Sequence, residues 1–315
     1  MVAVGNVNLD LTVLVERPPS PDEKLVAHRH YLGLGGAATN FSVACARLGL
    51  SCGLVAKVGL DPPGEMALRR LEAEGVDISH VSACPDAPTG LALILWTREG
   101  RGLVSCRGAN DRLSPEDLEE ARPYLSSARV VLGASLRLDV AEALASICSG
   151  GPRLILDPGG TLASHGIGEL SGILSSTFIY APNEVELYRS TGLRDLRRAL
   201  EAAWSAGPEL VVVKSGPRGC FIFDGERLRH VRAPRPARVL DPTGAGDAFN
   251  AGLVLGLLNG LGIVESARLA VATAALKVGR RGASNMPYLA ELRAFLGEIG
   301  WHDLASSLAG ARRHR

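Results

Sequence analysis

The chain has 315 residues, 46% of them hydrophobic, which suits one large α/β domain or two ordinary ones around a substantial core. Its 34 basic and 33 acidic residues leave a formal net charge of +1, so we expect no nucleic-acid polymer as a partner. The sequence has no apolar run of about 18 residues, and it begins with the strand-like Val2-Ala3-Val4 rather than a basic leader, so we expect neither a membrane span nor a secretory signal.

Six cysteines are scattered through the chain without C-x-x-C spacing. A zinc site would show closely spaced cysteine or histidine pairs, and a disulfide framework belongs to small secreted domains. We therefore expect reduced, mostly buried thiols in a cytoplasmic enzyme.

Short apolar runs alternate with helix-patterned segments along most of the chain. The runs are rich in Val, Ile and Leu, as in strands that are buried on both faces. We predict such strands at Val2–Leu9, Leu54–Val58, Val130–Gly133, Leu154–Asp157, Phe178–Ala181 and Leu210–Lys214. Between them, apolar residues recur at i, i+3 and i+4, which predicts helices at Ala38–Leu48, Glu65–Glu74, Pro115–Ala121, Val140–Cys148 and Leu193–Ala206. From Gly244 onward the pattern is mainly helical, and the whole predicts an α/β fold with a doubly wound, mostly parallel sheet flanked by helices.

Two segments, residues 11–34 and 90–107, interrupt this alternation and are typical of antiparallel strands with polar turns. The run from Gly90 to Trp96 is nearly all apolar, which would let another chain cover one side of it. Our hypothesis is a small β-sheet, or lid, over the main domain that also contributes to a homodimer. The core then comprises residues 1–10, 35–89 and 108–315, and we expect its basic end, Arg312–Arg315, to be a solvated terminus.

The clearest candidate for chemistry is Asp241-Pro242-Thr243-Gly244-Ala245-Gly246-Asp247, which precedes a helical run. Its small residues, Gly244–Gly246, allow backbone N–H groups to converge at a helix N-terminus, a place that favours anions. The carboxylate of Asp247 would repel a phosphate there unless it takes a proton from the hydroxyl that attacks the phosphate. The motif therefore indicates phosphoryl transfer, with an ordinary N-capping Asp on a glycine-rich turn as the alternative.

A dinucleotide-binding pattern is the second candidate. The segment Gly33–Ala38 satisfies G-x-G-x-x-A ahead of a helix, which would indicate an NAD-dependent oxidoreductase. However, the preceding residues 24–31 are too polar for the buried first strand of such a fold, and the acid further on, Asp61, lies in a loop. We prefer a site in which the glycines let the backbone approach a small polar ligand while Asn40 both donates and accepts.

Asn8 and Asp10 lie at the end of the first predicted strand. The two-residue period of a strand puts their side chains on one face, and open α/β sheets bind ligands beyond the carboxyl ends of their strands. An amide and a carboxylate on one face suit the vicinal hydroxyls of a polyol. Two turn-forming residues at a strand exit are the plainer alternative.

Two further segments follow predicted strands. Asn183 and Glu186 have the spacing of a capping box at a helix start, and their oxygen atoms are equally suited to Mg²⁺ and its waters. The turn Lys214–Gly219 is a weak candidate for a nucleotide contact. The sequence has no G-x-x-x-x-G-K-[ST] segment, which excludes a P-loop kinase.

In this order, these segments resemble the ribokinase-like (PfkB) carbohydrate kinase family over essentially the whole chain. Gly35-Gly36 with Asn40 is similar to the family's N-terminal signature, and Asp241–Asp247 is similar to its more specific C-terminal D-x-T-G-A-G-D signature. Further matches are Asp61 and Gly64 in a G-x-D-x-x-G stretch, Asn183 and Glu186 in N-x-x-E, Gly216–Gly219 in G-x-x-G, and Gly108-Ala109-Asn110 in a ribokinase-type G-A-N segment.

The resemblance implies a doubly wound core with a β lid, and an ATP-dependent, Mg²⁺-requiring kinase that phosphorylates a hydroxyl of a sugar or sugar-like polyol. It implies Asp247 as the base, Gly244, Ala245 and Gly246 as the anion hole, and Asn183 and Glu186 near Mg²⁺. The implied substrate residues are Asn8, Asp10, Gly35, Gly36, Asn40, Arg107 and Asn110. The implied nucleotide residues are Asn183, Lys214, Ser215, Gly216, Gly219 and Thr243. Family members often dimerise through the lid, and many bind a monovalent cation near Asp241 and the loop matching Arg280–Asn285, which is one residue shorter here than in ribokinase itself.

The substrate is less well specified. Ribokinase has a lysine where this chain has Ala37, and residues 134–136 do not match its sugar-binding glutamate. Arg107 would meet an anionic group, as in 2-keto-3-deoxygluconate kinases, or stay solvated. Nucleoside and inositol kinases also use this fold, and phosphosugar kinases are a further alternative. A sugar-sensing protein is the non-enzymatic alternative. Whether the donor is ATP or ADP stays open.

Overall fold

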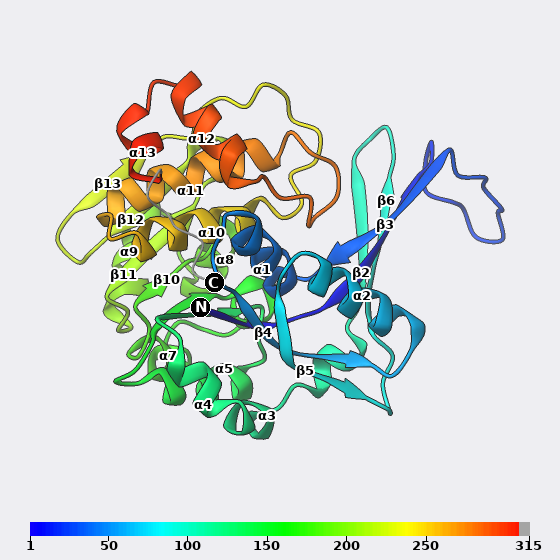
Figure 1. The fold of residues 1–315 in the computed structure, drawn as a ribbon, viewed down its shortest axis with the longest axis horizontal. Coiled ribbons are helices and arrows are strands. Elements are labelled where there is room, and N and C mark those ends of the chain that lie inside the picture. The colour runs from blue at the N-terminus through cyan, green and yellow to red at the C-terminus, as the bar shows by residue number, and fades with distance from the viewer. Residues whose placement is uncertain (309–315) are drawn as a thin grey trace.

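The computed structural model describes residues 1–308, and its centre is a nine-stranded sheet in the order β13-β12-β11-β10-β9-β8-β1-β4-β5 (Figure 1). All neighbours from β11 to β5 are parallel, whereas β12 and β13 are antiparallel at one edge. The strands are β1 (Val2–Gly5), β4 (Gly53–Gly59), β5 (Asp77–Cys84), β8 (Val130–Ala134), β9 (Arg153–Asp157), β10 (Ile179–Tyr180), β11 (Leu210–Lys214), β12 (Cys220–Phe223) and β13 (Leu228–Val231). The predicted α/β fold with a mostly parallel sheet is confirmed.

Helices cover both faces of this sheet because its strands are apolar on both sides. Val2 and Val4 pack into one buried cluster and Ala3 into the other, as the alternation of side chains along a strand requires. The helices are α1 (Ala37–Arg47), α2 (Pro62–Ala73), α3 (Pro115–Glu120), α4 (Arg122–Ser127), α5 (Leu138–Cys148), α6 (Gly159–Leu162), α7 (Ser171–Leu174), α8 (Glu184–Thr191), α9 (Leu196–Ser205), α10 (Ala245–Leu258), α11 (Ile263–Lys277), α12 (Leu289–Glu298) and α13 (His302–Ser307). Helices α10, α11 and α12 lie on one side of the sheet, and α3, α4 and α5 lie on the other (Figure 1).

A second, four-stranded sheet extends from the core in the order β3-β2-β6-β7, and we call it the lid (Figure 1). Its strands are β2 (Asn8–Leu14), β3 (Arg29–Gly35), β6 (Gly90–Trp96) and β7 (Arg101–Cys106). Only β2 and β6 are parallel to each other. Both interrupting segments of the sequence therefore form one sheet.

The first predicted strand, Val2–Leu9, was wrong as a single element. The chain leaves the large sheet after Gly5 and enters the lid at Asn8. Between them the N–H of Val7 donates to Asn110 Oδ1 at 2.8 Å, so this backbone bonds to a side chain instead of a strand neighbour. Asn8 and Asp10 consequently belong to the start of a lid strand.

Two general properties complete the fold. All six cysteines are free thiols, and of these only Cys106 is exposed. Within residues 1–308, no helix is both long and apolar enough to cross a membrane. The predicted solvated end, Arg312–Arg315, lies outside the described residues.

Candidate active site

Helix α10 begins in a way that presents backbone donors at its N-terminus. Gly244 is its N-cap in the left-handed conformation, with φ of 80°. A Cβ at Gly244 would lie 2.2 Å from the carbonyl oxygen of Ala283, so only glycine fits this turn. Of the predicted anion-hole donors, the N–H of Ala245 donates to Pro242 O at 3.1 Å, which leaves Gly246 and Asp247 to supply the remaining N–H groups of the first turn.

A cavity of about 670 Å³ opens beside this helix start. Its polar part unites most of the nucleotide and catalytic residues expected from the sequence: Asn183, Glu186, Lys214, Gly216, Gly219, Ala245, Gly246 and Asp247. Its other part is apolar and is lined by Pro236, Val239, Phe249, Val271, Ala274, Ala275 and Val278. A volume in this range, apolar with a few converging polar groups, is typical of a small-molecule site.

Asp247 lies in the first turn of α10 and lines the larger cavity. Its Oδ2 accepts a hydrogen bond from Asn40 Nδ2 at 2.8 Å. Burial raises the pKa of Asp247 to about 7, and the nearby Asp157 adds to this, whereas Asn40 and Lys214 oppose it. A carboxylate with a pKa near neutrality is well matched to general-base work.

Asp157 is a site residue that was not predicted from the sequence. It ends β9, is buried, and its Oδ2 accepts from Lys214 Nζ at 2.5 Å and from Asn250 Nδ2 at 2.6 Å. Burial would lower the pKa of Lys214, but Asp157 and Glu186 raise it on balance, so the ammonium stays charged. The available signal was an acid at the carboxyl end of a predicted parallel strand.

Asn183 and Glu186 form the predicted capping box at the start of α8. The N–H of Glu186 donates to Asn183 Oδ1 at 2.9 Å, and the N–H of Asn183 donates to Glu186 Oε2 at 2.8 Å. Burial and Asp157 raise the pKa of Glu186. Among residues 1–308, no group of three or more His, Cys, Asp or Glu side chains is arranged to hold a metal ion. The oxygen donors of Glu186 and Asp157 nevertheless suit Mg²⁺, which usually binds through one or two carboxylates together with substrate phosphates.

A second cavity of about 300 Å³ lies between the lid and the loop around residues 281–285. Of the residues predicted from the sequence, Asp10 and Asp241 line it. Its lining also includes Arg281, Ser284 and Asn285, from the loop that the resemblance had associated with a monovalent cation rather than with the substrate. Thr12, Tyr31, Arg47 and Trp96 were not predicted from the sequence, because no motif marks them and only strand pairing in the lid and packing of the chain bring them to this cavity.

Asp10 is an unusual feature of this smaller cavity. It is buried, and its Oδ1 has no hydrogen-bond partner within the described chain. Burial and the neighbouring Asp241 raise the pKa of Asp10 to about 6. A Cβ at Gly35 would lie 1.8 Å from Asp10 Oδ1, so this glycine makes room for the carboxylate. A buried acceptor without a partner, on a side chain that lines a cavity, suits a ligand hydroxyl.

The remaining predicted substrate residues do not line the smaller cavity. Asn110 Nδ2 donates to Asn8 Oδ1 at 2.7 Å, so this pair joins the start of β2 to the 3-10 turn Gly108–Arg112. Arg107 forms an ion pair with Asp111 at 2.5 Å. Gly36 has φ of 93°, and a Cβ there would lie 2.3 Å from the carbonyl oxygen of Asn6.

Two predicted nucleotide residues also point elsewhere. The Thr243 hydroxyl donates to Asp241 Oδ1 at 2.6 Å and is contacted by Arg101 of β7, so a lid residue reaches the start of the anion hole. Ser215 is buried at the end of β11, where its N–H donates to Gly219 O at 2.8 Å. Neither residue is among those that line the larger cavity.

The dinucleotide interpretation does not fit the fold. Gly33–Gly35 belong to β3, which pairs antiparallel with β2 in the lid. A dinucleotide fingerprint must instead follow a central parallel strand.

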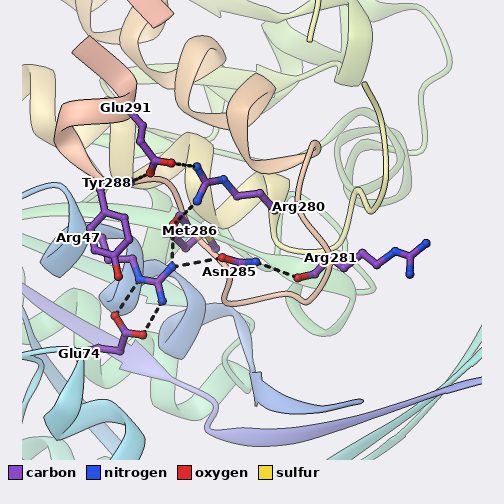
Figure 2. A network of polar contacts seen from close by, with 8 residues as sticks. All are labelled: Arg47, Glu74, Arg280, Arg281, Asn285, Met286, Tyr288 and Glu291. Atoms are coloured by element: carbon purple, nitrogen blue, oxygen red, sulfur yellow. Dashed lines mark hydrogen bonds and ion pairs between the residues drawn. The ribbon is translucent and has the colours of Figure 1, made fainter. Parts of the chain in front are cut away.

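The loop between α11 and α12 is held by a polar network (Figure 2). Arg47 pairs with Glu74 at 2.6 Å and donates to Met286 O at 2.8 Å. Arg280 also donates to Met286 O and pairs with Glu291 of α12. This loop carries Arg281 and Asn285 to the smaller cavity, so the network fixes one wall of that cavity.

The pfkB family of carbohydrate kinases matches residues 1–289. An uncharacterised sugar kinase from Archaeoglobus fulgidus is 35% identical over 243 residues, which cover 76% of this chain and 95% of the relative. An ATP-dependent ribose-1-phosphate kinase from Halopiger xanaduensis is 30% identical over 300 residues, which cover 95% of this chain and 98% of that protein. The solved structure of Arabidopsis thaliana ribokinase, complexed with ribose and ATP, has a TM-score of 0.83 at 29% identity and covers 94% of this chain and 97% of its own.

The match to the ribokinase structure over 94% of this chain agrees with the fold described above. These comparisons confirm the resemblance that the two signatures indicated, and with it the ribokinase-like fold. The chain belongs to the pfkB family of carbohydrate kinases.

Proposed function

We propose that this protein transfers the γ-phosphate of ATP to a hydroxyl of a sugar or sugar-like polyol, with Asp247 as the general base. One observation carries the proposal: a carboxylate whose pKa is raised to about 7 stands in the first turn of α10, beside backbone donors suited to an anion. An acid in that place is useful when it removes the proton of the attacking hydroxyl.

The two cavities suggest where the substrates bind. The larger one has an apolar part for the base of the nucleotide, and its polar part carries Lys214 and the start of α10 for the phosphates. The smaller one has room for a monosaccharide, and Asp10 offers an unpartnered oxygen to a sugar hydroxyl. The lid covers this cavity, which would exclude water and limit hydrolysis of ATP.

Mg²⁺ would be held by Glu186 and Asp157 together with the phosphates of the nucleotide. When bound, it would neutralise part of the charge on the transferring phosphoryl group. The groups of this protein would do the rest: Lys214 binds phosphate, the N–H groups of Gly246 and Asp247 orient it, and the Asp247 carboxylate takes the proton.

Asp247→Asn tests the role of the base because it preserves shape and removes the ability to accept a proton. Turnover should fall by roughly two to four orders of magnitude, while binding of sugar and of a non-hydrolysable ATP analogue, measured by calorimetry, should be retained. Asp303→Asn, at an exposed position in α13, is the matched control. Unchanged turnover in Asp247→Asn would remove this residue from the mechanism.

A phosphorylated sugar is the second candidate acceptor. Arg281 lines the smaller cavity, and its Nη1 reaches the Tyr31 hydroxyl at 3.4 Å rather than a carboxylate. The lid residue Arg101 brings a further positive charge to within 4.0 Å of Asp241. Guanidinium groups bind phosphate well, and one relative carries the name ribose-1-phosphate kinase.

A panel of acceptors separates these possibilities. Free sugars, sugar phosphates, nucleosides, inositols and 2-keto-3-deoxygluconate would be assayed with ATP and with ADP. If the acceptor is a sugar phosphate, Arg281→Met should raise its KM by about tenfold or more, as expected for a lost charge-assisted contact. The same substitution should leave the KM of a neutral sugar unchanged.

We also propose that the protein is a homodimer through the lid. The lid face opposite the smaller cavity is apolar, since strand pairing aligns Leu11, Val13, Leu93, Leu95 and Val104 on it. Val104 is 57% exposed, and such a face is more stable when a second copy covers it. Sedimentation equilibrium should show twice the monomer mass for the protein and for Val185→Glu, and a monomer for Val104→Glu combined with Leu93→Glu.

A further inference from the structure

Lys277, the last residue of α11, is a buried lysine with no role in the reaction described so far. Its side chain is 0% exposed, and its Nζ donates to the carbonyl oxygens of Asp241 at 3.0 Å and Arg280 at 3.3 Å. Burial lowers the pKa of Lys277 to about 8, although the carboxylates of Asp241 and Asp247 oppose this. Burying an ammonium is costly unless its hydrogens are well bonded, so its position calls for a specific reason.

Lys214 provides a useful contrast. Its ammonium contacts a carboxylate, that of Asp157 at 2.5 Å, and lines the larger cavity. The hydrogen-bond partners of Lys277 are backbone carbonyls instead, and they come from two separate segments. Lys277 therefore behaves as a cation that joins two pieces of backbone.

The two segments that Lys277 joins, residues 240–244 and 278–283, lie directly before and beside the anion hole. The N–H groups of Leu240 and Asp241 donate to Val278 O at 2.7 and 3.1 Å, and the Gly282 N–H donates to Asp241 Oδ2 at 2.9 Å. Close by, Gly244 packs against the carbonyl of Ala283. The position of residues 240–244, and hence of the first turn of α10, thus depends on residues 278–283.

A monovalent cation at this place would need the oxygen atoms that Lys277 already uses. Carbonyl and carboxylate oxygens are the ligands of such ions, and the carbonyls of Asp241 and Arg280 are of this kind. A second cation beside the ammonium would meet a like charge at short range. The residues present therefore do not fit the monovalent cation that the family resemblance implied near Asp241.

We propose that the Lys277 ammonium takes the place of this ion: it is a tethered cation that holds residues 278–283 against residues 240–244 and keeps the anion hole in position. Lys277 is thus a positioning residue, and phosphoryl transfer needs no added K⁺. Since the benefit lies in that transfer, this role rests on the function proposed above.

Salt dependence and substitution test the proposal together. Wild-type turnover in tetramethylammonium chloride should change by less than about twofold when KCl replaces it at equal ionic strength. Lys277→Ala should lower kcat by about 100-fold, as other small misplacements of a catalytic group do. Added K⁺ or NH₄⁺ should fill the vacated position and raise the kcat of this variant by at least about tenfold. Lys277→Met, which fills the space without a charge, should be inactive and should not respond. Lys57→Ala removes a lysine paired with Asp117 and should behave like the wild type.

A direct readout does not depend on turnover. Crystals soaked in Tl⁺, a heavy analogue of K⁺, should show an ion between the carbonyls of Asp241 and Arg280 in Lys277→Ala and none there in the wild type. K⁺ should also raise the unfolding temperature of Lys277→Ala alone. Tl⁺ bound at that position in the wild type, strong K⁺ stimulation of the wild type, or failure of K⁺ to rescue Lys277→Ala would overturn the proposal. If Lys277→Ala does not fold, the wild-type measurements still decide, and the Tl⁺ result is independent of whether the chain phosphorylates sugars.

Discussion

The larger and the smaller cavity are built from different parts of the chain. The larger one gathers the ends of β9 and β11 and the start of α10, all of which belong to the packed core. The smaller one is formed by lid strands on one side and the loop after α11 on the other. Chemistry common to all phosphoryl transfers thus sits on a rigid frame, whereas the acceptor is recognised by segments that can vary without disturbing that frame.

Of the substitutions that compare the two cavities, one in the larger cavity should have the largest effect on kinetics and stability. Lys214→Met should lower kcat/KM for ATP by about 100- to 1,000-fold, the usual consequence of losing one group that stabilises the transferred phosphoryl. It also leaves Asp157 buried without its cation, so the unfolding free energy should fall by roughly 3–5 kcal/mol. Steady-state kinetics and urea denaturation would measure both, with Lys57→Met as the control. An unchanged kcat/KM for ATP would show that Lys214 does not stabilise the transferred phosphoryl group.

A smaller and more selective effect is expected in the lid. Gly35→Ala would place a methyl group against Asp10, whose Oδ1 lies 1.8 Å from that position. The displaced carboxylate should raise the KM for the sugar by roughly ten- to a hundredfold, with little change in the KM for ATP. Gly102→Ala, in lid strand β7 and away from the smaller cavity, has open space at its Cβ and serves as the control. If both Michaelis constants rose together, the two cavities would not be separate binding sites.

The same division explains what the sequence could predict. The core residues were found because phosphate chemistry constrains short contiguous motifs, as at Gly244–Asp247 and Asn183–Glu186. Asp157 lacks such a motif: its meaning comes from Lys214 and Asn250, which lie far away in the chain and meet it only in the fold.

The lid residues were harder to predict for a different reason. Arg281 and Tyr31 are 250 positions apart in the sequence and come together through strand pairing and loop packing. The break between β1 and β2 was also missed, because the apolar pattern of Val2–Leu9 continues through the residues where the chain changes sheets. The burial and the role of Lys277 could not be predicted from the sequence, since a lysine that ends a helix is usually solvent-exposed.

The pH dependence of kcat/KM also distinguishes the two cavities, because the proposed base, Asp247, lines only the larger one. With a pKa raised to about 7, Asp247 is protonated below neutrality and ionised above it. The kcat/KM for the sugar should therefore fall about tenfold per pH unit below pH 7 and level off above it. Asn40→Ala removes a contact that lowers this pKa, so the midpoint should move to higher pH. A profile identical in the two proteins would assign the titration to another group.

The smallest effect concerns the stability of the lid side. Burial raises the pKa of Asp10 from 3.8 to about 6, so the folded state binds its proton more tightly than the unfolded state. Stability must then fall as the pH rises from about 4 to about 6, and the cost persists above that range. Asp10→Asn should accordingly raise the unfolding free energy at pH 7.5 by roughly 1–2 kcal/mol, less than the full pKa difference implies because the amide is still buried. The gain should shrink at pH 5, while sugar binding weakens at both pH values.

Asp224→Asn is the control of opposite sign, since backbone N–H groups and Arg229 lower the pKa of that carboxylate to about 2. If Asp10→Asn were less stable than the wild type at pH 7.5, the Asp10 carboxylate would be a structural contact rather than a group kept for the ligand.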